Sequence, residues 1–162
     1  MDYFCPSPSQ KLGDQVPRKT RILVLCTGNS ARSQMAERVL RSLDLNIEVH
    51  SAGTQAASEV HPAAIQVMKE IGLDISSSLP KPVSQFLRHS FDYVITLCDD
   101  ADQNCPAFTG PVKDRLHLGF PDPAKATGSD EEVLVAFRKV RDQIRSRFSE
   151  FYEKHLKLGQ PK

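Results

Sequence analysis

Residues 22–32 read Ile-Leu-Val-Leu-Cys-Thr-Gly-Asn-Ser-Ala-Arg, an apolar run followed by a short loop that contains a glycine. A β-branched and leucine-rich run that ends in such a loop predicts a buried strand. Residues 33–43 are rich in helix formers and repeat apolar side chains at helical spacing, which predicts a helix. The loop therefore joins a strand to a helix N-terminus, where unpaired N–H groups and the positive end of the helix dipole bind tetrahedral oxyanions.

The side chains of this loop suit a reaction on such an anion. Gly28 lets the backbone curl close to a ligand, and Arg32 can add a planar, bidentate pair of hydrogen bonds. The same positive field favours the thiolate of Cys26, which we expect to be nucleophilic near neutral pH. A buried cysteine and a solvating arginine would explain each residue singly, but not why they bracket one loop. The predicted oxyanion-binding residues are Thr27, Gly28, Asn29, Ser30, Ala31 and Arg32.

Composition indicates one globular domain that works in the cytoplasm. The chain has 162 residues, 40% of them apolar and 25% charged, and a net charge of +1. This charge gives no electrostatic reason to expect binding to nucleic acid or to a membrane surface. No apolar run has membrane-spanning length, and the N-terminus has no signal-peptide core. We expect a monomer without a cofactor, whose four cysteines are thiols unless their chemistry is redox.

The order of predicted elements indicates an α/β fold. Residues 1–19 contain three prolines and little periodicity, which predicts a mobile arm, and Cys5 within it is most simply an incidental thiol. Further strands are predicted at 47–51, 93–97 and 115–119, with helices at 62–71, 83–88 and 130–155. Alternating strands and helices predict one domain, residues 20–158, with a four-stranded parallel sheet and helices on both faces. Ligands of such sheets bind beyond the C-terminal strand ends, where Cys26, Cys98 and Asp122 can meet.

Two further cysteines, Cys98 and Cys105, bracket a polar loop of six residues. As core thiols they would need apolar neighbours, and only Cys98 has them, on one side. A zinc site is less favoured, because the sequence has no close Cys or His pair at finger spacing. A thiol relay explains them better, since one thiol can attack an adduct of Cys26 and a second can resolve the resulting disulfide.

The motifs VLCTGNSARSQMAE, HSAG and VITLCDDADQNCP resemble those of the thioredoxin-coupled arsenate reductases, in the low-molecular-weight protein tyrosine phosphatase superfamily. The resemblance extends from about residue 21 to residue 155. It implies that Cys26 attacks arsenate held by the loop amides and Arg32, and that Ser33 hydrogen-bonds the thiolate. It also implies that Asp122 protonates the leaving oxygen, although the residues alone favour an ordinary turn, in which Asp-Pro pairs are common, just as strongly.

The same resemblance assigns the other thiols to a disulfide relay. Cys98 matches the thiol that attacks the cysteine–arsenic adduct, which releases arsenite and forms a Cys26–Cys98 disulfide. Cys105 matches the resolving thiol, which leaves a Cys98–Cys105 disulfide for thioredoxin. Phosphate and sulfate are expected to mimic arsenate in the loop. Glutaredoxin with glutathione remains an alternative electron donor.

The sequence departs from this family at two places. Ala31 stands where some members have a second loop cysteine, a position outside the relay. Some members also bind potassium at positions that match Asn29, Glu37 and Ser51, but the fourth position aligns with Lys81. A lysine ammonium could replace the cation, so we expect no bound metal. Without such a role, Glu37 would be a solvated carboxylate in the first turns of its helix.

Two other functions use the same loop. A tyrosine phosphatase is compatible with it, but that family usually carries tyrosines after the Asp-Pro pair, where this chain has Ala124 and Lys125. Cys98 and Cys105 would also have no purpose in a phosphatase. A non-catalytic module that binds oxyanions or senses redox state would need the loop but not Asp122. Turnover of arsenate with a thioredoxin system separates the three.

Overall fold

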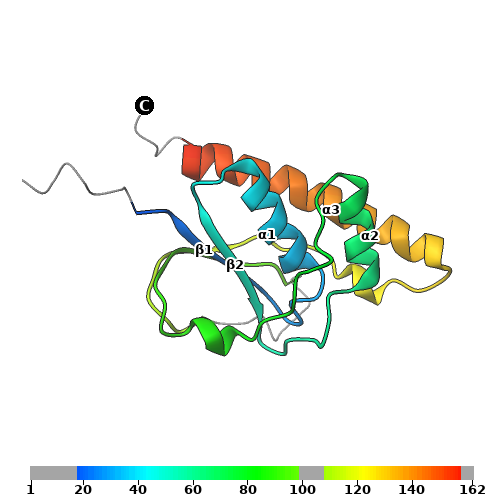
Figure 1. Cartoon of the computed structure of the whole chain (residues 1–162), viewed down its shortest axis with the longest axis horizontal. Coiled ribbons are helices and arrows are strands. Elements are labelled where there is room, and N and C mark those ends of the chain that lie inside the picture. The colour runs from blue at the N-terminus through cyan, green and yellow to red at the C-terminus, as the bar shows by residue number, and fades with distance from the viewer. Residues whose placement is uncertain (1–17, 99–107, 158–162) are drawn as a thin grey trace, which may run out of the picture.

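The computed structural model describes residues 18–98 and 108–157 (Figure 1). Strands and helices alternate along the chain, as predicted. In chain order the elements are β1 (Arg21–Cys26), α1 (Arg32–Leu43), β2 (Glu48–Gly53), α2 (Pro62–Glu70), the 3₁₀ helix η2 (Val83–Phe86), β3 (Phe91–Thr96), β4 (Val112–His117), the 3₁₀ helix η3 (Pro123–Lys125), α3 (Asp130–Phe151) and the π-helical turn η4 (Tyr152–Lys157).

The four described strands form one parallel sheet in the order β2-β1-β3-β4. The predicted parallel sheet is therefore confirmed. Leu25 of β1 pairs with Thr96 of β3, and Cys26 pairs with Gly53 of β2. The segments that follow β1, β2 and β3 consequently start at the same edge of the sheet, and Cys26 and Cys98 leave neighbouring strands there.

The two faces of the sheet are covered differently. Figure 1 shows α1, α2 and α3 together on one side, where they bury the larger apolar core with the inward side chains of β1, β2 and β3. On the opposite face, η2 contributes Phe86 to a smaller cluster that includes Leu23, Leu25, Phe91 and Phe108. Helices thus lie on both faces, as expected, but the second face has only a short 3₁₀ helix, which leaves it more thinly covered.

A polar group borders this second cluster. Glu48 accepts hydrogen bonds from His50 (2.8 Å) and Arg21 (3.2 Å). The His50 hydrogen bond, followed by the charge of Arg21, lowers the pKa of Glu48 and outweighs the opposing effect of burial. We therefore expect this group to stabilise the fold above the ordinary glutamate pKa and to lose that contribution as the pH falls through the lowered value.

The bounds of two elements differ from the sequence-based prediction. The fourth strand was predicted at 115–119, but β4 spans Val112–His117. It is an edge strand with Lys113, Asp114 and Arg115 exposed, so its first half carries no apolar pattern. The last helix was predicted to reach residue 155, but α3 ends at Phe151 and the wider turn η4 follows. Residues five apart share a face in such a turn, which places Leu156 in the core beside Phe151.

Within the described residues, no helix combines the length and the apolar character that a membrane crossing requires. Of the predicted arm, residues 1–17, with Cys5, lie outside the described residues, as do residues 99–107, with Cys105. The domain limits at residues 20 and 158 stay predictions.

Candidate active site

The loop between β1 and α1 ends at an open helix N-terminus. Ala31 is the N-cap of α1 and gives no side-chain hydrogen bond, and no acidic residue occurs in the first turn. The first N–H groups of α1 therefore have neither a side-chain cap from Ala31 nor an acidic side chain within their own turn. This end of the helix is suited to an anionic ligand.

Three backbone hydrogen bonds turn the carbonyl groups of the loop outward. The segment before α2 donates them over 2.8–2.9 Å, from Gln55 to Thr27, from Ala57 to Gly28 and from His61 to Ser30. In a trans peptide the N–H points away from the C=O of the same plane. The N–H groups of Gly28, Asn29 and Ala31 therefore point to the inner side of the loop, and the Asn29 N–H donates to the Cys26 sulfur over 3.2 Å. These three N–H groups therefore face the side of the loop on which Cys26 lies.

The Cys26 sulfur lies on this inner side of the loop, and 3% of the residue is exposed. A second hydrogen bond joins it to Ser33 Oγ over 2.8 Å. Ser33 Oγ accepts a hydrogen bond from Asn29 Nδ2 over 2.7 Å, so its own proton is available to the sulfur. The Asn29 N–H and the Ser33 hydroxyl can thus both donate to Cys26, which stabilises a thiolate more than a thiol.

Arg32 connects the loop to the segment after β4. Its buried guanidinium donates to the carbonyl oxygen of Phe120 (3.1 Å), and its Nη2 lies 3.6 Å from Asp122 Oδ2. The other carboxylate oxygen of Asp122 accepts from the N–H of Ala124 over 3.0 Å. The position of Asp122 is therefore compatible both with a turn residue and with an acid at the loop, because one carboxylate oxygen caps the turn η3 and the other faces Arg32.

Cys98 is fully buried, two residues beyond the end of β3. Leu97, just before it, donates its N–H to Leu25 (2.9 Å) and accepts from Phe120 (3.2 Å), so backbone hydrogen bonds fix the chain on both sides here. Cys98 therefore stands at the same sheet edge as Cys26, one strand away. Cys105, the third thiol of the predicted relay, lies outside the described residues.

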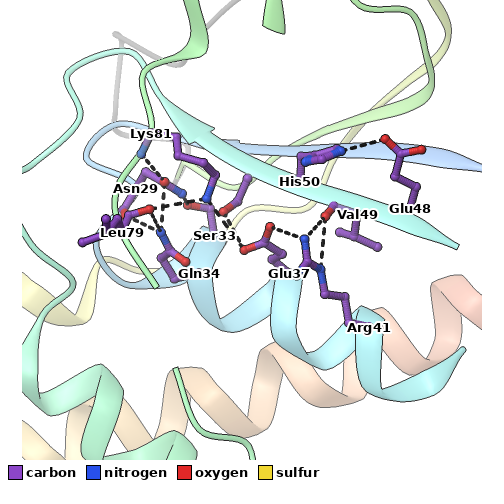
Figure 2. Close-up of polar contacts among 11 residues, drawn as sticks. Asn29, Ser33, Gln34, Glu37, Arg41, Glu48, Val49, His50, Leu79 and Lys81 are labelled. Atoms are coloured by element: carbon purple, nitrogen blue, oxygen red, sulfur yellow. Dashed lines mark hydrogen bonds and ion pairs between the residues drawn. The ribbon is translucent and has the colours of Figure 1, made fainter. Parts of the chain in front are cut away.

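A polar group behind the loop surrounds Glu37 (Figure 2). The residue is only 7% exposed, so it is not the solvated carboxylate that its early position in the helix suggested. Glu37 accepts from Ser51 (3.1 Å) and Arg41 (3.2 Å), and its Oε2 lies 4.0 Å from the Lys81 ammonium. Two cationic side chains therefore already neutralise this carboxylate. In the described ranges no group of three His, Cys, Asp or Glu side chains that could hold a metal occurs, and the absence of a bound potassium ion stays a prediction.

Gly53, at the end of β2, allows the loop to pack against the sheet. A methyl group added there would overlap the carbonyl oxygen of Thr27 and would lie 2.9 Å from Asn29 N and 3.0 Å from Gly28 C. All three atoms belong to the backbone of the loop, so no side chain can rotate away. At Gly28 itself, an added methyl would meet only Ser30 Oγ, at 3.4 Å. Within the free protein, the close backbone approach that requires a glycine is therefore at Gly53, and the approach of Gly28 to a bound ligand stays a prediction.

We expect Gly53→Ala to lower the free energy of unfolding by about 1–3 kcal/mol, the usual range for overpacking a buried site. Gly28→Ala adds the same atoms without a backbone clash in the free protein, so its effect on stability should be smaller. Urea denaturation of both variants measures the difference. Equal stability of the two variants would contradict the assigned role of Gly53.

Three groups that hold the loop received no role in the sequence analysis, although the first two lie within its motifs: Gln34, Gly53 and the backbone N–H of Lys81. Lys81 N donates to Asn29 Oδ1 over 2.8 Å, and Gln34 Nε2 donates to the same atom over 3.0 Å. A signal for Gln34 exists in the sequence, since polar residues recur at helical spacing on the face of α1 that borders Ser33 and Glu37. No local pattern indicates the contacts of Gly53 or of Lys81 N, because these contacts depend on the pairing of the chain with distant segments.

Comparison with known proteins agrees with this geometry. Residues 21–160 match the family model described as low molecular weight phosphotyrosine protein phosphatase. Arsenate reductases of Halalkalibacterium halodurans and Bacillus subtilis are 48% and 44% identical to the chain, over 83% and 82% of it and 96% and 94% of their own lengths. Among solved structures, an arsenate reductase in the phosphate binding state gives a TM-score of 0.69 at 32% identity, covering 83% of this chain and 98% of that one.

A second solved structure, described as a thioredoxin-dependent arsenate reductase from Corynebacterium glutamicum, gives a TM-score of 0.60 at 26% identity. The match covers 88% of this chain and 63% of that one. Family model, sequence relatives and structural neighbours therefore point the same way as the anion-binding loop. The chain belongs to the low molecular weight phosphotyrosine protein phosphatase family, and its arsenate reductases are the members that it resembles.

Proposed function

We propose that this protein reduces arsenate to arsenite through three thiols and that thioredoxin regenerates it. The observation that carries the proposal is the Cys26 sulfur, placed at the N-terminus of α1 with Asn29 N–H and Ser33 Oγ as hydrogen-bond partners. Arg32 and the inward N–H groups of the loop supply the positive surroundings of a bound oxyanion. Phosphate and sulfate have the same tetrahedral shape and negative charge, so they should compete with arsenate.

The first step is nucleophilic attack of the Cys26 thiolate on arsenic. A sulfur–arsenic bond forms, and one oxygen leaves as water after it receives a proton. Asp122 is the proposed source of that proton, because its Oδ2 lies on the loop side of η3, beside Arg32. Arg32 keeps the oxyanion in line with the sulfur through its planar guanidinium.

The second step transfers the electrons. The Cys98 thiolate attacks the Cys26 sulfur, the sulfur–arsenic bond breaks, and its electron pair stays on arsenic as arsenite leaves. The two thiols are oxidised to a Cys26–Cys98 disulfide. Cys105 then attacks Cys98, which frees Cys26 and forms a Cys98–Cys105 disulfide. Two electrons from the thioredoxin dithiol restore the reduced protein.

The test is an arsenate-reduction assay that compares two electron donors at equal enzyme concentration. One reaction contains thioredoxin, thioredoxin reductase and NADPH, and the other contains glutaredoxin, glutathione, glutathione reductase and NADPH. We expect arsenate-dependent NADPH oxidation with thioredoxin and little with glutaredoxin. Turnover only with the glutathione system would leave arsenate reduction in place but contradict the thioredoxin step. No turnover with either donor would contradict the function.

A phosphatase is the second candidate, because a cysteine, an arginine and an aspartate in this arrangement can also act on a phosphate ester. The residues that follow Asp122 in η3 are Pro123, Ala124 and Lys125, so no aromatic side chain frames an aryl ester from this segment. We therefore expect only slow hydrolysis of p-nitrophenyl phosphate, measured beside the arsenate assay.

We further propose that the Lys81 ammonium takes the place of a potassium ion beside Glu37. It lies 4.0 Å from the carboxylate, and Arg41 contacts the other oxygen of the same group. We therefore expect the rate of arsenate reduction to be equal in potassium chloride and in tetramethylammonium chloride at the same ionic strength. Lys81→Met removes the ammonium and should make the rate respond to potassium. A potassium response of the unaltered protein would contradict this proposal.

A further inference from the structure

Gln34, the third residue of α1, lies behind the loop and away from the inner side that the donors surround. The residue is 1% exposed, and its Nε2 donates to three oxygens: Asn29 Oδ1 (3.0 Å), Asn29 O (3.1 Å) and Leu79 O (3.1 Å). Figure 2 shows this amide between the loop residue Asn29 and the Leu79 segment. Two N–H bonds serve three acceptors, so every proton of this group is used.

The contacts of Gln34 act on a residue that is held in an unusual conformation. Asn29 has φ +50°, the left-handed region that few residues other than glycine adopt. Its side-chain oxygen accepts from Gln34 and from Lys81 N, and this pair of donors fixes which end of the carboxamide is the oxygen. The Nδ2 end is then directed to Ser33 Oγ.

The orientation of the Asn29 carboxamide also decides the direction of the hydrogen bond between Ser33 and Cys26. Ser33 Oγ accepts from Asn29 Nδ2, so the serine proton is left for the Cys26 sulfur. If the carboxamide turned over, its oxygen would face Ser33 and would attract that proton away from sulfur. The orientation of Asn29 therefore decides whether Ser33 stabilises a thiolate.

One atom of Gln34 destabilises the folded state. Its Oε1 is buried and has no hydrogen-bond partner among the residues that the structure describes. A buried acceptor without a donor disfavours the folded state. A glutamine here is therefore explained by what its NH₂ group does and not by its oxygen.

We propose that Gln34 is a positioning residue for the nucleophile, which acts on Cys26 through Asn29 and Ser33 without touching the substrate. The inference rests on Cys26 as the nucleophile of the proposed function. It concerns the ionisation of one thiol, however, so it can be measured without arsenate. Failure of the arsenate assay and failure of this inference are thus separate results.

The experiment follows the rate of Cys26 alkylation by iodoacetamide against pH, with peptide mapping to distinguish Cys26 from the other thiols. Gln34→Met has a similar length but no donor, and its pH midpoint should rise by about half a unit to one unit, as expected for the loss of one hydrogen bond. At a pH below both midpoints, where the thiolate is the minor form, this corresponds to alkylation that is about three- to tenfold slower. Gln66→Met, the same substitution at an exposed position of α2, is the matched control and should leave the midpoint unchanged.

Gln34→Glu keeps the shape of the side chain but replaces the donor by an acceptor. It favours the turned-over carboxamide of Asn29, so its midpoint should rise at least as far as that of Gln34→Met. Its negative charge also disfavours a thiolate directly, so if Gln34→Met fails to fold, the decisive result from Gln34→Glu is an unchanged midpoint, which would overturn the inference. Midpoints equal to that of the unaltered protein in the folded variants would overturn the inference.

A double-mutant cycle separates positioning from a general effect on the fold. Ser33→Ala removes the group that joins Asn29 to the sulfur, so adding Gln34→Met to it should raise the alkylation midpoint no further. A merely structural role predicts additive shifts. Additivity in the cycle would contradict transmission through Asn29 and Ser33, whereas a null second shift supports it.

Discussion

Cys26→Ser is expected to abolish arsenate reduction, with a loss of at least about 1,000-fold. A serine hydroxyl is barely ionised at neutral pH, so the two donors that hold the Cys26 sulfur would face a neutral oxygen instead of a thiolate. Serine also cannot supply the sulfur that the second thiol attacks, so both the first and second steps fail. Arsenate-dependent NADPH oxidation with the thioredoxin system measures the loss.

Cys5→Ser is the matched control for this variant, because Cys5 lies in the predicted arm and has no part in the proposed relay. It should retain the activity of the unaltered protein. Thermal unfolding and phosphate binding of Cys26→Ser show whether the loop survives, since serine is nearly isosteric. Substantial turnover by a folded Cys26→Ser protein would contradict the assignment of the nucleophile.

The part of the site that the sequence predicts is the part that is contiguous along the chain. The strand, the loop and the helix around Cys26 follow one another, so apolar spacing and the loop glycine indicate them directly. The approach of Asp122 to Arg32 required a parallel sheet in addition, because their segments are far apart in sequence. Their catalytic roles remain predictions that come from the resemblance and the chemistry.

The contacts that hold the loop in place could not be predicted in the same way. Gly53 is a close-approach glycine only because Cys26 pairs with it across β1 and β2. Lys81 N reaches Asn29 only because residues 81 and 82 join the end of β2, where Gly53 donates to the Lys81 carbonyl and forms a bridge with Pro82. Both relations arise from strand register, which a local pattern of residue types does not specify.

The secondary-structure elements also divide into those that the sequence predicts and those that it does not. Strongly apolar strands and amphipathic helices were predicted to within a few residues, because burial imposes a period on the sequence. β4 was misplaced because an edge strand buries little and tolerates charged residues along most of its length. The end of α3 was misplaced because η4 has a wider turn that the period of an α-helix does not describe.

The asymmetry of the two sheet faces bears on the second thiol. Cys98 is buried at the sheet edge beyond β3, and backbone hydrogen bonds fix Leu97 before it. At the other end of the intervening loop, Phe108 packs on Phe91 in the smaller cluster, and Arg115 donates to its carbonyl over 2.6 Å. One end of the segment that carries Cys105 is therefore anchored at Phe108 on the more thinly covered face, whereas Leu97 at the other end belongs to the larger core.

Cys105→Ser is expected to stop after a single turnover, with Cys26 and Cys98 joined by a disulfide. The first two steps need only these two thiols, so one arsenite should be released for each protein molecule before the resolving step fails. Cys98→Ser should form neither disulfide and should release no arsenite, because no second thiol is then in place to attack the Cys26 sulfur of the adduct.

Closing the eight-residue segment from Cys98 to Cys105 in the unaltered protein is entropically mild, since the cost grows only with the logarithm of loop length. Peptide mapping after an acid quench of arsenate-treated protein identifies each disulfide, and Cys5→Ser again serves as the control, with the Cys98–Cys105 bond expected. Normal cycling of Cys105→Ser with thioredoxin would show that the three-thiol relay is wrong and would favour a glutathione-dependent route.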